Sequence, residues 1–273
     1  MHIVKSTTLA PSYPGTQAVR RAVELLKAFP PEQPERSLAE LALAVGLNRT
    51  TAYRLLSALQ GEGMIERDGP VYRLGPEIMA LGARAAGTGH LRAAARLELD
   101  SLAQDTGETV TIEVLVGRDV LILDEAIGRH LIGTVPSLGT RWPAHATSTG
   151  KVLLAAGPQE AIDELLAEPL RRLTPRTIVE PAAFRRELAR VRDKGHAVTA
   201  EEVELGFVAV SVPVWAASGA VVAALSVGGP KPRFGNDRLI ELASRLPDVA
   251  ERISERLGFR PIGSSSAASR RRP

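Results

Sequence analysis

The segment from Ser37 to Leu59 constrains the fold most, because it carries residues suited to the ends of two short helices. Ser37 with Glu40 three positions later forms a capping-box pattern, which predicts that a helix begins there. Gly46 is suited to the left-handed conformation that ends a helix, and Asn48 is a favourable N-cap for the next one. The segment therefore predicts two short helices joined by a glycine turn, which is the helix-turn-helix arrangement.

The second of these helices is expected to read DNA. Its apolar positions share one stripe, and the polar positions near its N-terminus lie off that stripe. Hydroxyl and amide groups suit base edges, whereas guanidinium groups suit phosphates and guanine. We predict that this helix enters the major groove, with these residues near bases: Asn48, Arg49, Thr50, Thr51 and Tyr53. Arg54 is expected near a phosphate.

A predicted hairpin follows, because two β-prone runs flank Asp68-Gly69. A hairpin directly after a reading helix is typical of a wing, and Arg67 and Arg73 on either side of its turn are expected near the phosphate backbone. Two other interpretations remain open: an ordinary helical subdomain, and a winged helix that contacts only protein. The reading helix favours DNA, since it contains Arg49 and Arg54 and no acidic residue.

The rest of the chain alternates between strand-like and helix-like segments. A linker helix is expected over 76–90, and a final helix over about 235–257. Strands are expected near 109–116, 119–125, 131–135, 196–202, 207–214 and 220–228, with helices near 148–156, 158–167 and 181–194 between them. Hairpins that flank a helical middle predict an α+β domain with an antiparallel sheet, which could enclose a small-molecule pocket. The domains are therefore expected at 16–75 and 91–257, with a flexible start over 1–15 and a disordered tail over 258–273.

Composition excludes several classes of protein. The chain has no cysteine, so disulfide scaffolds, thiol nucleophiles and cysteine-type zinc fingers are excluded. Its five histidines show no metal-ligand spacing, and we expect neither a metal nor a cofactor. No apolar run approaches the roughly 20 residues of a membrane span, and no signal peptide is evident, so a cytoplasmic protein is expected. The stretch from His145 to Val152 fails as a phosphate loop, because His145 replaces the first glycine and Val152 the final Ser or Thr. No catalytic grouping is visible, although a small-acid hydrolase or transferase with an appended winged helix remains the alternative.

The chain resembles the IclR family of bacterial transcription regulators over residues 16–257. The resemblance is carried by LAELALAVGLNRTTAYRLLSALQGEGMI, by YRLG at the end of the wing, by PAHATSTGKVLLA, and by EEVELGF followed by LSVGGP. It implies a winged helix, a linker helix and a GAF-like effector domain. It also implies a DNA operator, a small organic acid as effector, and a homodimer or dimer of dimers. The function expected is that of a ligand-responsive regulator, acting as a repressor.

The same resemblance implies where the effector binds. The expected residues are Leu131, Thr134, Ser148, Thr149, Thr199, Phe207, Ala209, Ser226 and Gly228. Some members of the family carry Asp, Cys or Ser where this chain has Thr199, Ala209 and Gly228, so this site is less polar. Backbone N–H groups near Ser148 and Thr149, at a helix N-terminus, favour a carboxylate. The alternative for Ser226 and Thr199 is that they are core residues with satisfied hydroxyls.

Overall fold

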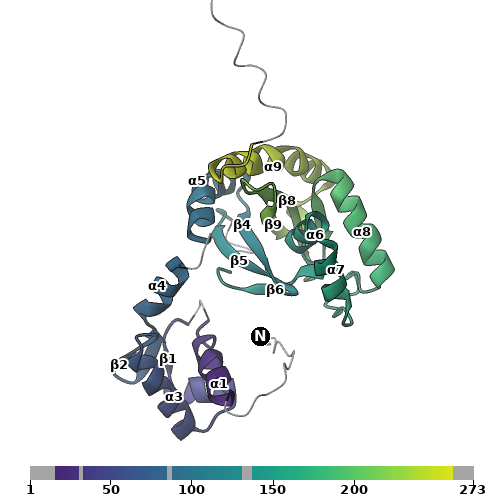
Figure 1. Cartoon of the computed structure of the whole chain (residues 1–273). Coiled ribbons are helices and arrows are strands. Elements are labelled where there is room, and N and C mark those ends of the chain that lie inside the picture. Colours follow the sequence, from purple (N-terminus) through teal and green to yellow (C-terminus); the bar gives the residue numbers. More distant parts are fainter. Residues whose placement is uncertain (1–15, 31–32, 85–87, 131–136, 261–273) are drawn as a thin grey trace, which may run out of the picture. The chain divides into compact units, whose positions relative to one another are not determined.

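The chain forms two compact units, which comprise residues 1–86 and 87–273. The computed structural model describes residues 16–30, 33–84, 88–130 and 137–260 (Figure 1). The start of the chain over 1–15, which was expected to be flexible, lies outside these ranges. So do most of the expected tail and the expected strand at 131–135.

The first unit contains a helix-turn-helix with a small sheet. Its elements are α1 (Gln17–Leu26), β1 (Arg36–Ser37), α2 (Leu38–Val45), α3 (Arg49–Gly61), β2 (Ile65–Asp68), β3 (Val71–Leu74) and α4 (Pro76–Arg84). The strands form an antiparallel sheet in the order β1-β3-β2, in which β1 is an addition to the expected hairpin.

The local signals at the helix ends are confirmed. The Ser37 and Glu40 side chains form the reciprocal capping box, and Gly46 has a φ of 68°. The Asn48 side chain accepts a hydrogen bond from the backbone N–H of Thr51 at 2.8 Å. The turn between α2 and α3 is therefore fixed by residues next to it in sequence.

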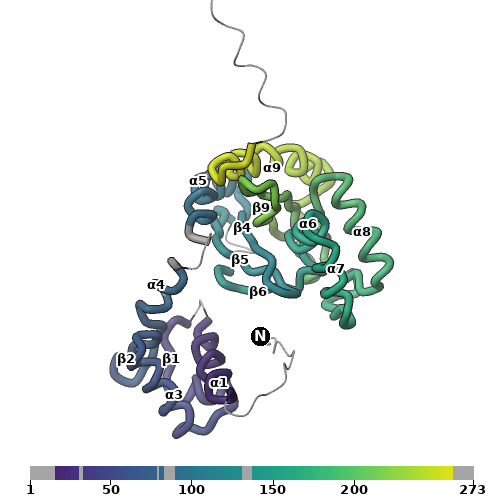
Figure 2. The backbone as a smooth tube through the Cα atoms, viewed as in Figure 1, coloured from purple at the N-terminus to yellow at the C-terminus, as the bar shows by residue number. Residues whose placement is uncertain are grey.

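The second unit is an α+β domain built on one antiparallel sheet. Its helices are α5 (Thr88–Thr106), α6 (Ser148–Ala156), α7 (Gln159–Leu166), α8 (Pro181–Lys194) and α9 (Asn236–Arg256), with short 3-10 turns η1 (Ala144–Ala146) and η2 (Lys231–Arg233). Its strands are β4 (Thr109–Val116), β5 (Asp119–Ala126), β6 (Arg141–Pro143), β7 (Ala197–Ala200), β8 (Phe207–Trp215) and β9 (Val221–Pro230). They lie in the order β6-β5-β4-β9-β8-β7. β4 therefore pairs with β9, the last described strand in the sequence (Figure 2).

The two faces of this sheet are covered by different helices. Alternate residues of β8, from Val208 to Val214, pack with α5 and α9 in one apolar cluster. The other face packs against α6, α7 and α8 in a second cluster, which includes Ala197 and Ala224 (Figure 1). The intervening residues of β8, Ala209 and Ser211, therefore lie on the α6 side of the sheet.

The described part of the molecule contains neither a candidate membrane-spanning helix nor a candidate metal-binding cluster. None of its helices combines the length and the apolar character needed to cross a membrane. Across the same ranges, no group of three or more His, Asp or Glu side chains is placed to hold a metal ion.

Candidate functional site

The reading helix α3 presents the side chains that the sequence singled out. Ala52 and Leu56 are buried, and Leu56 packs with Leu25 and Leu41 in the core of the first unit. The outward positions are exposed at Asn48, Arg49, Thr50, Tyr53 and Arg54, and Thr51 is half-buried. Because α3 contains no acidic residue, its outer surface is neutral to basic over its whole length.

The two wing arginines already have protein partners. The Arg67 Nε donates to the Gly69 carbonyl oxygen at 2.9 Å, and its guanidinium lies 5.5 Å from the centre of the Tyr72 ring. Arg73 pairs with Glu66 across the hairpin at 2.7 Å. Both arginines remain exposed. A phosphate that binds Arg73 would have to displace the Glu66 carboxylate, whereas the two Arg67 contacts given above involve no acidic residue.

In the second unit, the strand register groups the expected effector residues in adjacent rows on the α6 side of the sheet. Thr199 lies opposite Ala209, which in turn lies opposite Gly228. Ser226 lies in the next row, between Ser211 and Thr111. A Cβ atom on Gly228 would come within 2.7 Å of the Phe207 ring, so the glycine allows that ring to lie against β9.

The N-terminal end of α6 contacts this face through two hydroxyl groups. The Ser148 Oγ lies 2.6 Å from the Ser211 Oγ, and the Thr149 Oγ1 donates to the Glu113 Oε2 at 2.7 Å. All four side chains are buried. Seven of the nine expected effector residues therefore lie on this α6-facing side of the sheet or at the helix end that contacts it. The other two, Leu131 and Thr134, lie outside the described residues.

Glu113 was not among the residues expected at this site, although it is a buried acid on this face. Thr111 and Thr149 each donate a hydrogen bond to one of its carboxylate oxygens, both at 2.7 Å. Burial raises the pKa of the Glu113 carboxyl above its ordinary value, and these two hydroxyls only partly oppose that shift. An acid within the apolar run of β4 was the available signal.

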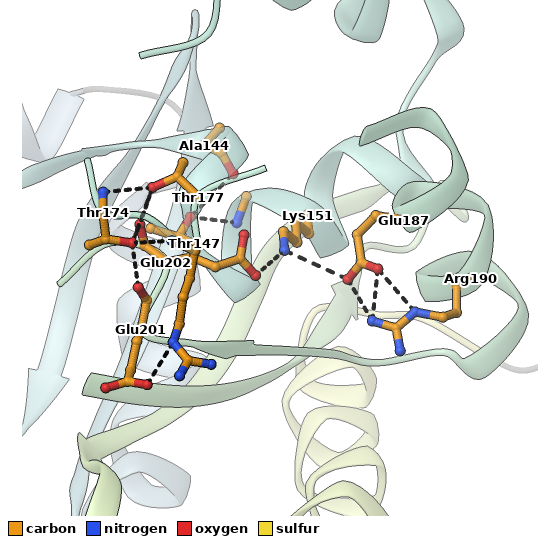
Figure 3. Close-up of polar contacts among 11 residues, drawn as sticks. Ala144, Thr147, Lys151, Thr174, Thr177, Glu187, Arg190, Glu201 and Glu202 are labelled. Atoms are coloured by element: carbon orange, nitrogen blue, oxygen red, sulfur yellow. Dashed lines mark hydrogen bonds and ion pairs between the residues drawn. The ribbon is translucent and has the colours of Figure 1, made fainter. Parts of the chain in front are cut away.

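A second polar cluster surrounds the Lys151 side chain of α6 (Figure 3). Lys151 is fully buried, and its Nζ donates to the Glu202 carboxylate and lies 3.6 Å from the Glu187 carboxylate. Glu187 also binds Arg190, and the Glu202 carbonyl oxygen accepts from Thr177. Lys151 thus ties α6 to α8 and to the segment after β7, and its charge is compensated by protein carboxylates.

The adjacent acids Glu201 and Glu202 differ from expectation in their backbone. The expected strand over 196–202 ends at Ala200, and Glu201 has a φ of 63°, outside any strand. The Glu201 carboxylate binds Lys231 at 2.6 Å and Arg176 at 3.0 Å, whereas that of Glu202 binds Lys151. The two carboxylates serve separate ion pairs and do not form an acid/base pair.

A pocket of about 320 Å³ lies away from the expected effector residues. It is formed by the C-terminal parts of α6 and α8 and the end of β8, with Ala155, Val191 and Trp215 among its walls. Arg192 lines it and donates from Nε to the Ala155 carbonyl oxygen. None of the seven expected effector residues that the structure describes lines this pocket, which makes it a control region for ligand binding.

Comparison with known proteins finds matching families for both units. Residues 18–69 match the IclR helix-turn-helix domain, and residues 83–255 match the C-terminal domain of bacterial IclR transcriptional regulators. The HTH-type transcriptional regulator XynR of Escherichia coli is 30% identical over 90% of this chain and 99% of its own. The HTH-type transcriptional repressor AllR of Klebsiella pneumoniae is 29% identical over 90% of this chain and 92% of its own.

Solved structures agree with the sequence comparison. An IclR homologue from Microbacterium hydrocarbonoxydans, crystallised in complex with 4-hydroxybenzoate, superposes with a TM-score of 0.76. It is 27% identical to this chain and covers 89% of it, and the match extends over 99% of the homologue.

Proposed function

Because the chain belongs to the IclR family of bacterial transcriptional regulators, we propose that it is a repressor whose C-terminal unit senses a small organic acid. The chain is a DNA-binding transcriptional regulator with an effector-binding C-terminal domain, and its family is not enzymatic. That membership argues against the alternative of a hydrolase or transferase.

The outward surface of α3 carries the proposal for DNA. Arg49 and Thr50 are exposed at the first turn of a helix that has no acidic residue. They can therefore approach base edges without repulsion between that helix and the negatively charged DNA phosphates. Arg54 and the wing residue Arg67 are proposed to contact phosphates, and Arg73 to do so by exchanging Glu66 for a phosphate. We propose a dimer or dimer of dimers, because a helix-turn-helix protein reads two half-sites with two copies.

The effector is proposed to bind on the α6 side of the sheet in the second unit. The first backbone N–H groups of a helix lack helical acceptors and favour an anion. In α6 the Thr147 side chain caps the N–H of Gly150, so those of Ser148 and Thr149 are proposed to receive the carboxylate. The homologue that binds 4-hydroxybenzoate supports an organic acid, and the repressor AllR supports repression.

Operator binding tests the DNA part of this proposal. The change Arg49→Ala should weaken binding to duplex DNA from the gene's own upstream region by about 1–3 kcal/mol, if Arg49 makes a bidentate contact with guanine. Fluorescence anisotropy at one fixed salt concentration measures that loss. An unchanged affinity would reject Arg49 as a base contact.

A matched variant separates base contacts from phosphate contacts. Arg54→Ala on the same helix should weaken binding to specific and unrelated DNA alike. It should also flatten the dependence of log affinity on log salt by about one unit. A loss confined to the specific sequence would assign Arg54 to a base instead.

A further inference from the structure

We propose that the effector is a hydroxylated acid, and that Glu113 accepts a hydrogen bond from its hydroxyl group. This inference rests on the proposed function, since it concerns the effector site on the α6 side of the sheet. It starts from a buried carboxyl group that the family resemblance did not assign to that site.

Glu113 is buried among polar groups without an opposite charge. The threonine hydroxyls are its hydrogen-bond partners among the described residues, and no described Lys, Arg or His lies within ion-pair distance of it. Lys151 follows Thr149 by two residues on α6, yet its ammonium is directed to Glu202 and Glu187. A buried carboxylate in this setting is stabilised by each further hydrogen bond that it accepts.

The carboxylate retains acceptor capacity after both threonine contacts. Each carboxyl oxygen of Glu113 accepts a hydrogen bond from one threonine, Thr111 or Thr149. A free acceptor position remains in either protonation state, about two when the group is ionised and about one on the carbonyl oxygen when it is protonated. Both donors lie at the effector site: Thr149 is next to Ser148, and Thr111 lies opposite Ser226 in the strand register. A ligand held against this face can therefore supply a further donor to Glu113.

The same carboxylate constrains how an acid can be oriented. A ligand carboxylate placed beside Glu113 would put two acidic groups in one buried site without a cation, where only one of them can readily carry a charge. The acid end is therefore directed toward the start of α6, where Ser148 contacts Ser211 at 2.6 Å, and the hydroxyl end toward Glu113. Glu113 becomes the residue that distinguishes a hydroxylated acid from the same acid without the hydroxyl.

Paired probes test this assignment on the full chain. The pairs are 4-hydroxybenzoate with benzoate and glycerate with propionate, and affinities come from isothermal titration. In at least one pair, the hydroxylated acid should bind about tenfold tighter or more, as expected for one further buried hydrogen bond. Equal affinities within both pairs would overturn the proposal.

Variants at position 113 assign the preference to its carboxylate. Glu113→Leu removes the acceptor at similar size. It should reduce the ratio of the two affinities within a pair to about threefold or less, whereas Glu113→Gln keeps one acceptor oxygen and should keep most of that affinity ratio. Thr111→Val frees one acceptor position, so the ratio should stay or rise. A general packing defect would instead weaken both acids of a pair equally and leave the ratio unchanged, which would overturn the proposal. Arg192→Ala, in the other pocket, should not change either affinity.

Operator binding by the same samples separates the two levels of inference. If the wild-type chain binds its operator but none of the four acids, the hydroxylated-acid proposal is overturned and the DNA-binding function stands. If amino-substituted analogues bind more tightly than the hydroxylated acids, Glu113 selects an amine and the proposal is wrong. If the operator itself is not bound, the proposed function fails.

Discussion

The imidazole of His145 is buried in η1, and its Nε2 lies 2.8 Å from the Arg171 carbonyl oxygen. Burial lowers the pKa of this imidazole below its ordinary value of about 6.5, although the contact with Arg171 opposes that shift. When the pH falls through about 6.5, the unfolded chain therefore takes up a proton before the folded chain does. Above that pH, the neutral imidazole of His145 is compatible with the folded state. As the pH falls below it, the contribution of His145 to the free energy of unfolding is lost.

A pH series tests this behaviour of His145. The free energy of unfolding of the wild-type chain should fall between about pH 7.5 and 5.5, and His145→Gln should remove the part due to this imidazole. Urea unfolding at each pH gives both curves, and His196→Gln, which replaces a half-buried imidazole, is the matched control. Parallel curves for wild type and His145→Gln would contradict the assignment.

At the residue scale, the sequence predicts what neighbouring residues decide. The caps at Ser37, Gly46 and Asn48 depend on contacts within four residues, and each has the predicted geometry. The contacts of the effector site have another origin: Thr149 reaches Glu113 across 36 residues and Ser148 reaches Ser211 across 63. Such pairs follow from the strand order, which no local pattern specifies.

At the scale of elements, the close packing of α6 against η1 depends on Gly150. A Cβ atom at this position would lie 2.1 Å from the Ala144 carbonyl oxygen, which is backbone and cannot rotate away. Any side chain therefore forces α6 away from η1, and with it Ser148 and Thr149. The glycine in this motif serves helix packing rather than phosphate binding.

Gly150→Ala should destabilise the second unit by about 1–3 kcal/mol, the usual cost of overpacking. Gly82→Ala is the matched control, because Gly82 lies within α4 with no atom within 4 Å of an added Cβ. That change should be neutral or stabilising by about 0.5–1 kcal/mol, because alanine favours a helix. Denaturant unfolding compares the two variants, and an equal effect of both would contradict the packing role.

Element lengths also decide what the sequence could predict. Long segments with clear periodicity, such as α8 and β8, lie within a residue or two of their expected ranges. The two-residue β1 and the three-residue β6 were not expected, because they become strands only by pairing with β3 and β5. Too few residues are present in either for an alternating pattern to be visible.

At the scale of the whole molecule, DNA recognition and effector recognition lie in separate compact units. Residues 87–273 contain their own six-stranded sheet and two apolar clusters, one on each face. A fragment spanning 88–260 should therefore fold alone and bind the hydroxylated acids as the full chain does, without binding the operator. Circular dichroism and titration measure both properties, and a fragment that does not fold would show that the second unit depends on the first.

The full chain should behave differently from this fragment, because a regulator must couple its two binding sites. If a bound acid weakens operator binding by a given factor, then saturating operator must weaken acid binding by the same factor, since the coupling free energy is reciprocal. Titrating the acid into the full chain with and without operator DNA should show that loss, and the fragment should show none. An acid that binds the full chain equally well in both conditions is a ligand of the second unit without regulatory effect. That result would contradict the role of the tested acid as the effector, even if the acid binds tightly.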